Sequence, residues 1–159
     1  MIKLLKNADV YAPAHLGKQD VLVIGEKIVR IAPEINGYEN LPEAQIIDLE
    51  GKILVPGYID LHVHITGGGG EQGPASRVPE SQLRFFTRNG ITTVVGLLGT
   101  DGITRSLENL VAKARALTEE GITAYALTGA YGYPTNTITG SIEKDIMTVS
   151  YTHLRAHET

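Results

Sequence analysis

Two histidines separated by a single residue are the clearest candidates for chemistry in this sequence. His62 and His64 end the apolar segment 58–64, which has the composition of a β-strand. Because side chains alternate between the two faces of a strand, both imidazoles project from one face, about 7 Å apart along the backbone. Two imidazoles at the end of a strand can bind one metal ion. The alternative is that one or both are hydrogen-bonded core residues.

A run of four glycines follows the histidines, and a carboxylate stands directly after it. Gly67–Gly70 has no side chains, so its backbone groups can approach a ligand closely. Glu71 could then receive a substrate ammonium group or accept a hydrogen bond from metal-bound water. A flexible surface loop with a solvated glutamate is the alternative interpretation. A phosphate-binding loop is excluded, because that motif ends in Lys followed by Ser or Thr.

Two further segments place polar side chains directly after apolar runs. Thr100 and Asp101 follow the run 94–99, and Tyr131 follows Leu127 and its small neighbours. A phenol at such a position can donate a hydrogen bond to a carbonyl oxygen as that oxygen gains negative charge. Loop packing is the alternative for Tyr131, and a helix N-cap is the alternative for Thr100 and Asp101. Their shared position after predicted strands favours a functional role.

These candidates are positioned by a repeated strand–helix pattern that begins after Gly57. Apolar, β-branched runs predict strands, and apolar residues at three- and four-residue intervals predict helices that end at glycines. The predicted strands are 58–64, 91–97 and 122–127, and the predicted helices are 79–89 and 107–117. Strand–helix–strand units of roughly 30 residues are typical of a parallel sheet or barrel. The active sites of such barrels lie at the carboxyl ends of the strands.

The chain before residue 58 has a different pattern, with short strands joined by turns. The predicted strands are Leu4–Tyr11, Asp20–Ile24, Lys27–Ala32, Ile46–Leu49 and Lys52–Val55. The last two bracket Glu50-Gly51, which predicts a hairpin turn between them. We therefore predict a small β-domain over residues 1–57 and a barrel-like region over residues 58–147.

The last twelve residues, 148–159, do not continue either pattern. They mix Tyr, His, Arg and Glu without an apolar face, and they are similar to a translated sequencing-adapter read-through. We expect this tail to be artefactual or disordered, and we assign no function to His153 or His157.

Composition excludes several classes of function. The net charge of −4 and the absence of a Lys/Arg cluster argue against a nucleic-acid partner. No apolar run approaches the roughly 20 residues that span a bilayer, so we expect no membrane association. The sequence has no Cys and no Gly-x-Ser-x-Gly motif, which excludes disulfides, thiol nucleophiles and a serine elbow. Without a recognisable secretory signal, we expect a cytoplasmic protein.

The order of these motifs resembles the amidohydrolase superfamily. The segment 55–64 and the repeats after it resemble that superfamily, and the segments 67–71, 96–101 and 127–131 are closely similar to isoaspartyl dipeptidases. The resemblance covers about residues 1–147. It implies an α/β fold: the N-terminal part of a (β/α)8 TIM-type barrel, preceded by a small urease-type β-sandwich segment.

The same resemblance implies a zinc metallopeptidase that hydrolyses β-aspartyl (isoaspartyl) dipeptides through metal-activated water. His62 and His64 would ligate the more buried ion of a Zn2+ pair. Tyr131 would hydrogen-bond the scissile carbonyl oxygen, and Glu71 would hold the substrate's α-amino end; these two are the implied catalytic residues. The implied substrate-binding residues are Gly69, Glu71, Thr100 and Tyr131. The implied partners are a small dipeptide substrate and further copies of the same chain in a homo-oligomer.

The family also needs residues that this sequence does not supply. These are a carbamylated lysine that bridges the two Zn2+ ions, two more histidines, an aspartate that acts as ligand and base, and arginines. The lysine is expected just past Met147, and Lys144 is too early to replace it. We therefore expect the 159 residues alone to be inactive, with an unpaired apolar edge at the third strand, Ile122–Leu127, that favours aggregation.

Other interpretations stay open. The complete enzyme could be another amidohydrolase, of the D-aminoacylase, dihydroorotase or hydantoinase type. Against the last two, the usual basic residue shortly after the histidine pair is replaced here by Gly67–Glu71, which suits a substrate amine. A non-catalytic fragment is the alternative from another class.

Overall fold

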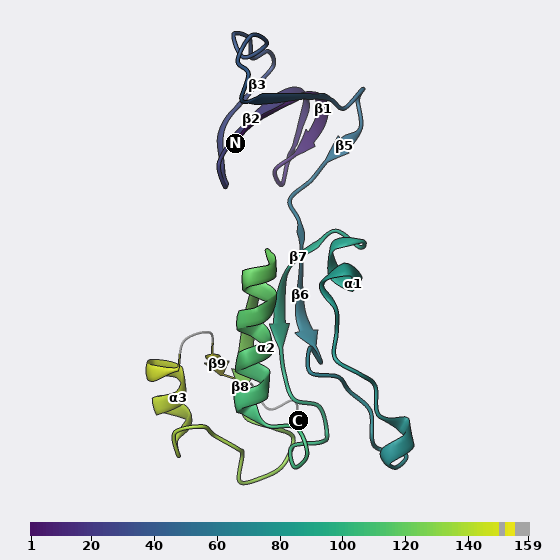
Figure 1. The fold of residues 1–159 in the computed structure, drawn as a ribbon, viewed down its shortest axis with the longest axis vertical. Coiled ribbons are helices and arrows are strands. Elements are labelled where there is room, and N and C mark those ends of the chain that lie inside the picture. Colours follow the sequence, from purple (N-terminus) through teal and green to yellow (C-terminus); the bar gives the residue numbers. More distant parts are fainter. Residues whose placement is uncertain (150–151, 155–159) are drawn as a thin grey trace. The chain divides into compact units, whose positions relative to one another are not determined.

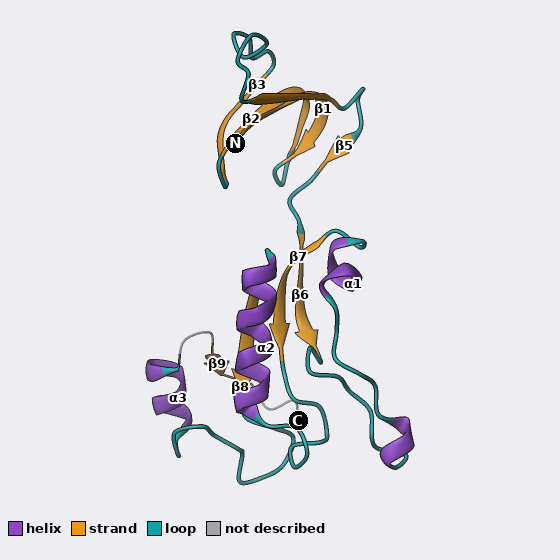
Figure 2. Ribbon diagram, viewed as in Figure 1, coloured by secondary structure: helices purple, strands orange, loops and turns teal. Residues whose placement is uncertain are grey.

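The computed structural model describes residues 1–149 and the backbone of residues 152–154. The chain divides into two compact units, Met1–Pro56 and Gly57–Thr159. Figure 2 shows the difference between them, since the first unit contains strands and loops, whereas the second alternates strands with helices. No helix in the described part of the chain is long and apolar enough to cross a membrane.

The first unit is a five-stranded sheet built around its first strand. The strands are β1 (Ile2–Tyr11), β2 (His15–Ile24), β3 (Lys27–Ala32), β4 (Ala44–Asp48) and β5 (Ile53–Leu54). Their order is β3-β2-β1-β4, with β5 also paired to β1. β1–β2 and β2–β3 are antiparallel, whereas β4 and β5 both run parallel to β1.

The predicted hairpin at Glu50-Gly51 is wrong, because β4 and β5 pair with β1 and not with each other. Both turn residues have positive φ, and so does Asn7 opposite them in β1. The buried carboxylate of Asp20 accepts hydrogen bonds from the Asn7 and Ile35 amides at 2.9 and 3.0 Å. This contact stabilises the irregularity in β1 at Asn7. The Leu49 and Gly51 amides donate to the Lys6 and Asn7 carbonyls at 2.8 Å, so the chain continues along β1 at Glu50-Gly51 without reversing.

The second unit is a parallel sheet with helices between its strands (Figure 1). The strands are β6 (Tyr58–Val63), β7 (Ile91–Gly96), β8 (Thr123–Thr128) and β9 (Thr152–Leu154), in that spatial order. The helices are α1 (Leu83–Thr87), α2 (Leu107–Glu120) and α3 (Ile142–Thr148), with a 3-10 turn, η1, at Pro74–Ser76. This is a mixed α/β unit whose sheet stays open over the described residues.

The core of the second unit forms where α2 packs on the sheet. Leu110 and Leu117 of the helix and Val94 of β7 are fully buried there. The Ser106 side chain caps the helix by accepting a hydrogen bond from the Asn109 amide, and Gly121 ends it in a left-handed conformation. The prediction that this helix ends before Gly121 is confirmed, since α2 ends at Glu120.

The helix predicted over residues 79–89 is shorter than expected. Only Leu83–Thr87 is helical, and Gln82 before it is extended. The amide of Ser81 instead donates to the Ile65 carbonyl at 3.0 Å. This bond holds the residues before α1 beside the segment that follows β6. Tertiary contacts with that segment therefore outweigh local helix propensity.

The edge of the third strand that was expected to be open is paired at its carboxyl end. β9 pairs there in parallel with β8, with Ala126 opposite Thr152 and Thr128 opposite Leu154. Thr148 is the last residue of α3. His157 lies outside the described residues, and only the backbone of His153 is described. The opposite edge strand, β6, exposes Ile59 and Leu61 by 64% and 68%.

Candidate functional site

The two histidines lie together at the carboxyl end of β6. His62 is within the strand and is exposed, and His64 follows the strand and is partly buried. Their ring centroids are 5.6 Å apart, with the planes nearly perpendicular at 85°. The alternation of side chains along the strand therefore places both imidazoles on one face, as the sequence predicts.

His64 is held in one orientation by its neighbours. Its Nδ1 lies 3.2 Å from the Leu97 carbonyl oxygen, which can only accept, so Nδ1 carries the hydrogen. A Cβ atom at Gly68 or Gly99 would come within 3.3 or 3.2 Å of the ring, so glycine at both positions lets the backbone pack closely against the imidazole. With Nδ1 donating to a carbonyl, the Nε2 lone pair is free, which is the arrangement of histidines that ligate metals.

The described residues supply only part of the ligand set that a metal site needs. Among residues 1–149, no group of three or more His, Cys, Asp or Glu side chains converges on one point. Zinc sites use three or four protein ligands, so the two imidazoles form part of such a site. Asp60 is turned elsewhere, because its carboxylate accepts a hydrogen bond from the His62 amide at 3.1 Å.

The segment after the histidines, residues 66–78, is a folded loop and is called the glycine loop below. Its two arms are joined by the Val78 amide, which donates to the Gly68 carbonyl at 2.9 Å. Gly67 and Gly69 have positive φ, and a Cβ there would lie 2.2 Å from the Val78 oxygen and 2.3 Å from the Ser76 oxygen. Only glycine allows the arms to approach so closely. These contacts give the segment a defined shape, while Glu71 at its tip is exposed, as the alternative of a surface loop with a solvated glutamate expects.

Glu71 follows the glycines and meets Thr100 from the next strand end. The Thr100 hydroxyl donates to Glu71 Oε1 at 2.6 Å, and both residues line a pocket of about 430 Å3. This hydrogen bond is the main cause that lowers the pKa of Glu71, and the positive charge of Arg105 adds to it. Glu71 is therefore an ionised carboxylate at the pocket wall, which suits a cation.

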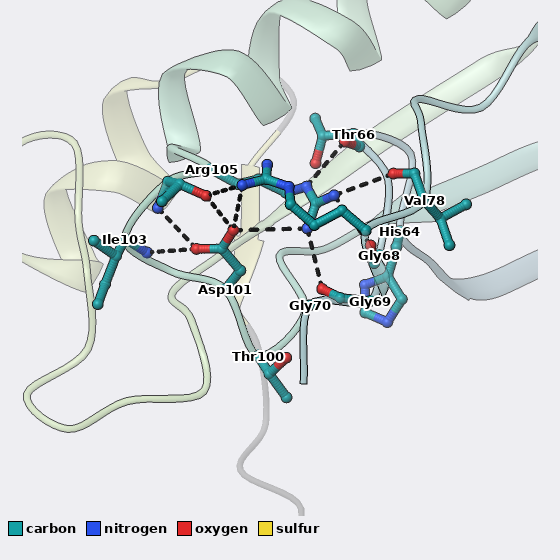
Figure 3. Close-up of polar contacts among 12 residues, drawn as sticks. His64, Thr66, Gly68, Gly69, Gly70, Val78, Thr100, Asp101, Ile103 and Arg105 are labelled. Carbon is teal, nitrogen blue, oxygen red and sulfur yellow. Dashed lines mark hydrogen bonds and ion pairs between the residues drawn. The ribbon is translucent and has the colours of Figure 1, made fainter. Parts of the chain in front are cut away.

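Asp101 organises the segment 99–104, which is called the Asp101 loop. Its carboxylate accepts from the Thr104 hydroxyl and from the amides of Thr104 and Ile103 at 2.8 and 3.2 Å. These bonds, with Arg77 at 3.3 Å, lower its pKa to about 2, the Thr104 hydroxyl contributing most. Figure 3 shows this carboxylate facing Arg105. Neither Thr100 nor Asp101 caps α2, whose cap is Ser106.

Tyr131 lies in the segment after β8, residues 129–141, which is called the tyrosine loop. Its side chain is 72% exposed, and it does not line the pocket beside Glu71. The loop itself is anchored by Asp145 of α3, a fully buried carboxylate. The structure thus brings Glu71 and Thr100 together, with the histidines at the adjoining strand end, and leaves Tyr131 on a separate loop.

Comparison with known proteins follows this geometry. A β-aspartyl dipeptidase from Fervidobacterium islandicum AW-1 is 50% identical, with a TM-score of 0.89 over 96% of this chain and 41% of that one. A second structure of that dipeptidase, in complex with β-Asp-Leu, is 49% identical, with a TM-score of 0.88 over 96% and 39% of the two chains. The dihydroorotase of Staphylococcus aureus MRSA252 is 33% identical over 111 residues, which are 70% of this chain and 25% of the enzyme.

The chain belongs to the amidohydrolase superfamily. This confirms the resemblance drawn from the sequence. An L-hydantoinase from Arthrobacter aurescens is 20% identical, with a TM-score of 0.55. It shares the fold over 79% of this chain and 27% of the hydantoinase chain. No family model matches the chain. The amidohydrolase chain spans about two fifths of the length of the dipeptidases and a quarter of the dihydroorotase.

Sequence reasoning missed two residues of this amidohydrolase chain that hold the site loops. Arg105 is 5% exposed, and Asp145 is fully buried. Asp145 had a weak local signal, since it lies three residues after Ile142, a spacing that places both residues on one face of a helix. Arg105 had none, because it stands between loop residues and a helix cap, where arginines are ordinarily exposed.

Proposed function

We propose that this chain is the N-terminal part of a metal-dependent amidohydrolase that cleaves β-aspartyl dipeptides. The observation that carries the proposal is the ionised Glu71 at the pocket wall, which is fixed by Thr100 and follows a loop of defined shape. A β-aspartyl dipeptide keeps a free α-ammonium group beside the scissile amide, and this carboxylate is placed to receive it. Half of the residues are identical to those of a dipeptidase solved with β-Asp-Leu, which supports this substrate class.

The residues of this chain would divide the work as follows. His62 and His64 would hold one Zn2+ of a pair, which supplies polarisation of the amide carbonyl and a water whose pKa falls to about 7. Glu71 binds the substrate ammonium, and Thr100 orients that carboxylate, while the Gly69 backbone borders the same position. Tyr131 donates a hydrogen bond to the carbonyl oxygen as its charge develops.

The remaining parts of the enzyme lie beyond these residues. We infer that the open sheet β6–β9 is the first section of a (β/α)8 barrel, and that the first unit is a urease-type β-sandwich segment. The carbamylated lysine that bridges the zinc pair, the other histidines and the aspartate base would come from later strand ends. We infer a cytoplasmic homo-oligomer.

A dihydroorotase is the second candidate, because one is 33% identical to this chain. Its substrate has no ammonium group to meet a carboxylate at this position. In this chain the loop after the histidines presents Glu71, an ionised carboxylate that suits the α-ammonium group of a β-aspartyl dipeptide. The pocket therefore favours an amine substrate over those of the hydantoinase and dihydroorotase types.

The test is a chimera in which this chain replaces the matching N-terminal part of the Fervidobacterium dipeptidase. We expect zinc-dependent hydrolysis of β-Asp-Leu and no hydrolysis of dihydroorotate. His62→Ala should abolish zinc binding and activity together, since two or three remaining ligands hold the ion poorly. Glu71→Gln should retain zinc and raise KM, because it removes only the charge that the ammonium meets.

The 159-residue chain assayed alone with added zinc should show no turnover above a metal-only control. A chimera that hydrolyses dihydroorotate but not β-Asp-Leu would contradict the proposal. Loss of zinc in Glu71→Gln would show that the division of roles between Glu71 and the histidines is wrong.

A further inference from the structure

Arg105 is a buried cation that no step of the proposed reaction uses. Its side chain is 5% exposed, and it carries a permanent positive charge. Its partners are backbone carbonyl oxygens. Nε donates to Thr66 at 3.2 Å, Nη2 to Gly68 and Val78 at 3.0 and 3.1 Å, and Nη1 to Gly69 at 3.4 Å. All four acceptors belong to the glycine loop (Figure 3).

These contacts join the two arms of the glycine loop. Thr66, Gly68 and Gly69 lie on the outgoing arm, and Val78 lies on the returning arm. Four carbonyl dipoles aimed at one place repel each other unless a cation stands between them. The planar guanidinium supplies both the charge and a fork of donors in fixed directions, which a lysine ammonium does not.

Arg105 also joins the glycine loop to the Asp101 loop. Its Nη1 lies 3.8 Å from Asp101 Oδ2, and Asp101 fixes its own loop through the Thr104 and Ile103 amides. One of these two loops carries Glu71, and the other carries Thr100. The guanidinium therefore helps to fix the two loops relative to each other, together with Arg77 of the glycine loop, which lies 3.3 Å from the same Asp101 oxygen.

We propose that Arg105 is the positioning residue for recognition of the substrate ammonium group. It acts through the glycine loop and the Asp101 loop, which it holds together so that Glu71 and Thr100 meet at the pocket wall. The inference rests on the proposed function for its substrate. The part of the proposal in which Arg105 holds the two arms of the glycine loop together rests on the hydrogen bonds and does not depend on the proposed function.

Arg105→Lys in the 159-residue chain tests the clamp by amide hydrogen exchange. Residues 66–78 should exchange about tenfold faster or more, since the lysine keeps the charge but cannot reach four carbonyls. Residues 107–120 of α2 should be unchanged. Arg84→Lys, an exposed residue of α1, is the matched control and should alter neither segment. Unchanged exchange in residues 66–78, or equal acceleration throughout the second unit, overturns the proposal.

The same substitution in the chimera tests the effect on recognition. KM for β-Asp-Leu should rise about tenfold, with kcat altered less than about threefold and zinc content unchanged. In the Glu71→Gln background, Arg105→Lys should change KM by less than about threefold, because the contact that it positions is already lost. Effects that multiply independently, or loss of zinc, overturn the proposal. If the unmutated chimera does not cleave β-Asp-Leu, the proposed function fails, and hydrogen exchange alone decides the role of Arg105.

Discussion

The glycine loop and the tyrosine loop follow parallel strands of one sheet, yet buried side chains of opposite charge hold them. Arg105 donates to four carbonyls of the glycine loop. Asp145 accepts from the Thr128 hydroxyl at the end of β8 and from the amides of Ile138 and Thr139 at 2.9 and 2.8 Å. A loop whose carbonyls face inward needs a cation, and one whose amides face inward needs an anion.

The two anchors also differ in where they come from along the chain. Asp145 belongs to α3, which directly follows the loop that it holds, so the tyrosine loop is anchored locally. Arg105 follows β7 in the sequence, and its contacts link the loop after β6 to the loop after β7. A local anchor sets the shape of one loop, whereas an anchor from a neighbouring strand end also sets the position of one loop relative to another. Pairs of residues that act together, such as Glu71 and Thr100, need the second kind.

The largest expected effect comes from removing the local anchor. Asp145→Ala leaves the buried Thr128 hydroxyl and two partly buried loop amides without this acceptor, which should cost about 4 kcal/mol at roughly 1–3 kcal/mol for each group left unsatisfied. The free energy of unfolding from urea titration measures it. Glu143→Gln, an exposed carboxylate in the same helix turn, is the control and should have little effect. Equal stability of the two variants would show that Asp145 does not anchor the loop.

The second prediction separates the functions of the two loops. Tyr131→Phe in the chimera should lower kcat about 10²-fold with zinc content unchanged, the usual effect of losing one donor to a developing oxyanion. Substitutions at Glu71, on the glycine loop, should act on KM. Tyr133→Phe removes a hydroxyl from the same tyrosine loop and should leave kcat unchanged. A near-normal kcat in Tyr131→Phe would return this residue to a packing role.

The third prediction uses pH to distinguish the anchors. Burial alone would raise the pKa of Asp145, but hydrogen bonds from Thr128, Thr139 and Ile138 outweigh it and lower the pKa. A lowered folded-state pKa contributes stability that is full above the unfolded value of about 3.9 and is lost as pH falls through the folded value. The arginine keeps its charge throughout this range.

Urea titrations at successive pH values below about 5 should therefore separate two variants. Arg105→Lys should lose stability in parallel with the unmutated chain. Asp145→Ala should lose less, because the titrating carboxylate is gone. Parallel loss in all three chains would show that the carboxylate of Asp145 does not titrate with unfolding.

The smallest effect is expected at the contact between the glycine loop and the Asp101 loop. Thr100→Val removes the hydrogen bond that is the first cause of the lowered pKa of Glu71, so that pKa should rise toward its usual value. KM for β-Asp-Leu in the chimera should rise roughly threefold at neutral pH, and its increase in acid should begin at higher pH. Thr92→Val, an exposed threonine of β7 outside the pocket, is the control. If KM begins to rise in acid at the same pH in Thr100→Val as in the unmutated chimera, Thr100 does not control the ionisation of Glu71.

The parts of this structure that follow from local pattern could be predicted, and those set by distant contacts could not. Alternation along β6 is enough to place His62 and His64 together, and Gly121 marks the end of α2. The course of β4 and β5 depends on pairing with β1, for example where the Leu49 amide donates to the Lys6 carbonyl far away in the sequence. Arg105 is likewise defined by loop carbonyls more than 25 residues before it. Such a contact leaves no periodic pattern of apolar residues in the sequence.

The central position of β1 has a consequence for the order in which the protein folds during synthesis. One edge of β1 pairs with β2, which follows directly, but the other pairs with Ala44–Asp48 and Ile53–Leu54. That second edge has no partner until the ribosome has made β4 and β5, a delay of seconds at about 5–20 residues per second. Both edges are complete once Leu54 has emerged, before any strand of the second unit exists. The first unit is therefore the part of the chain able to fold first, while the residues of the site are still being translated.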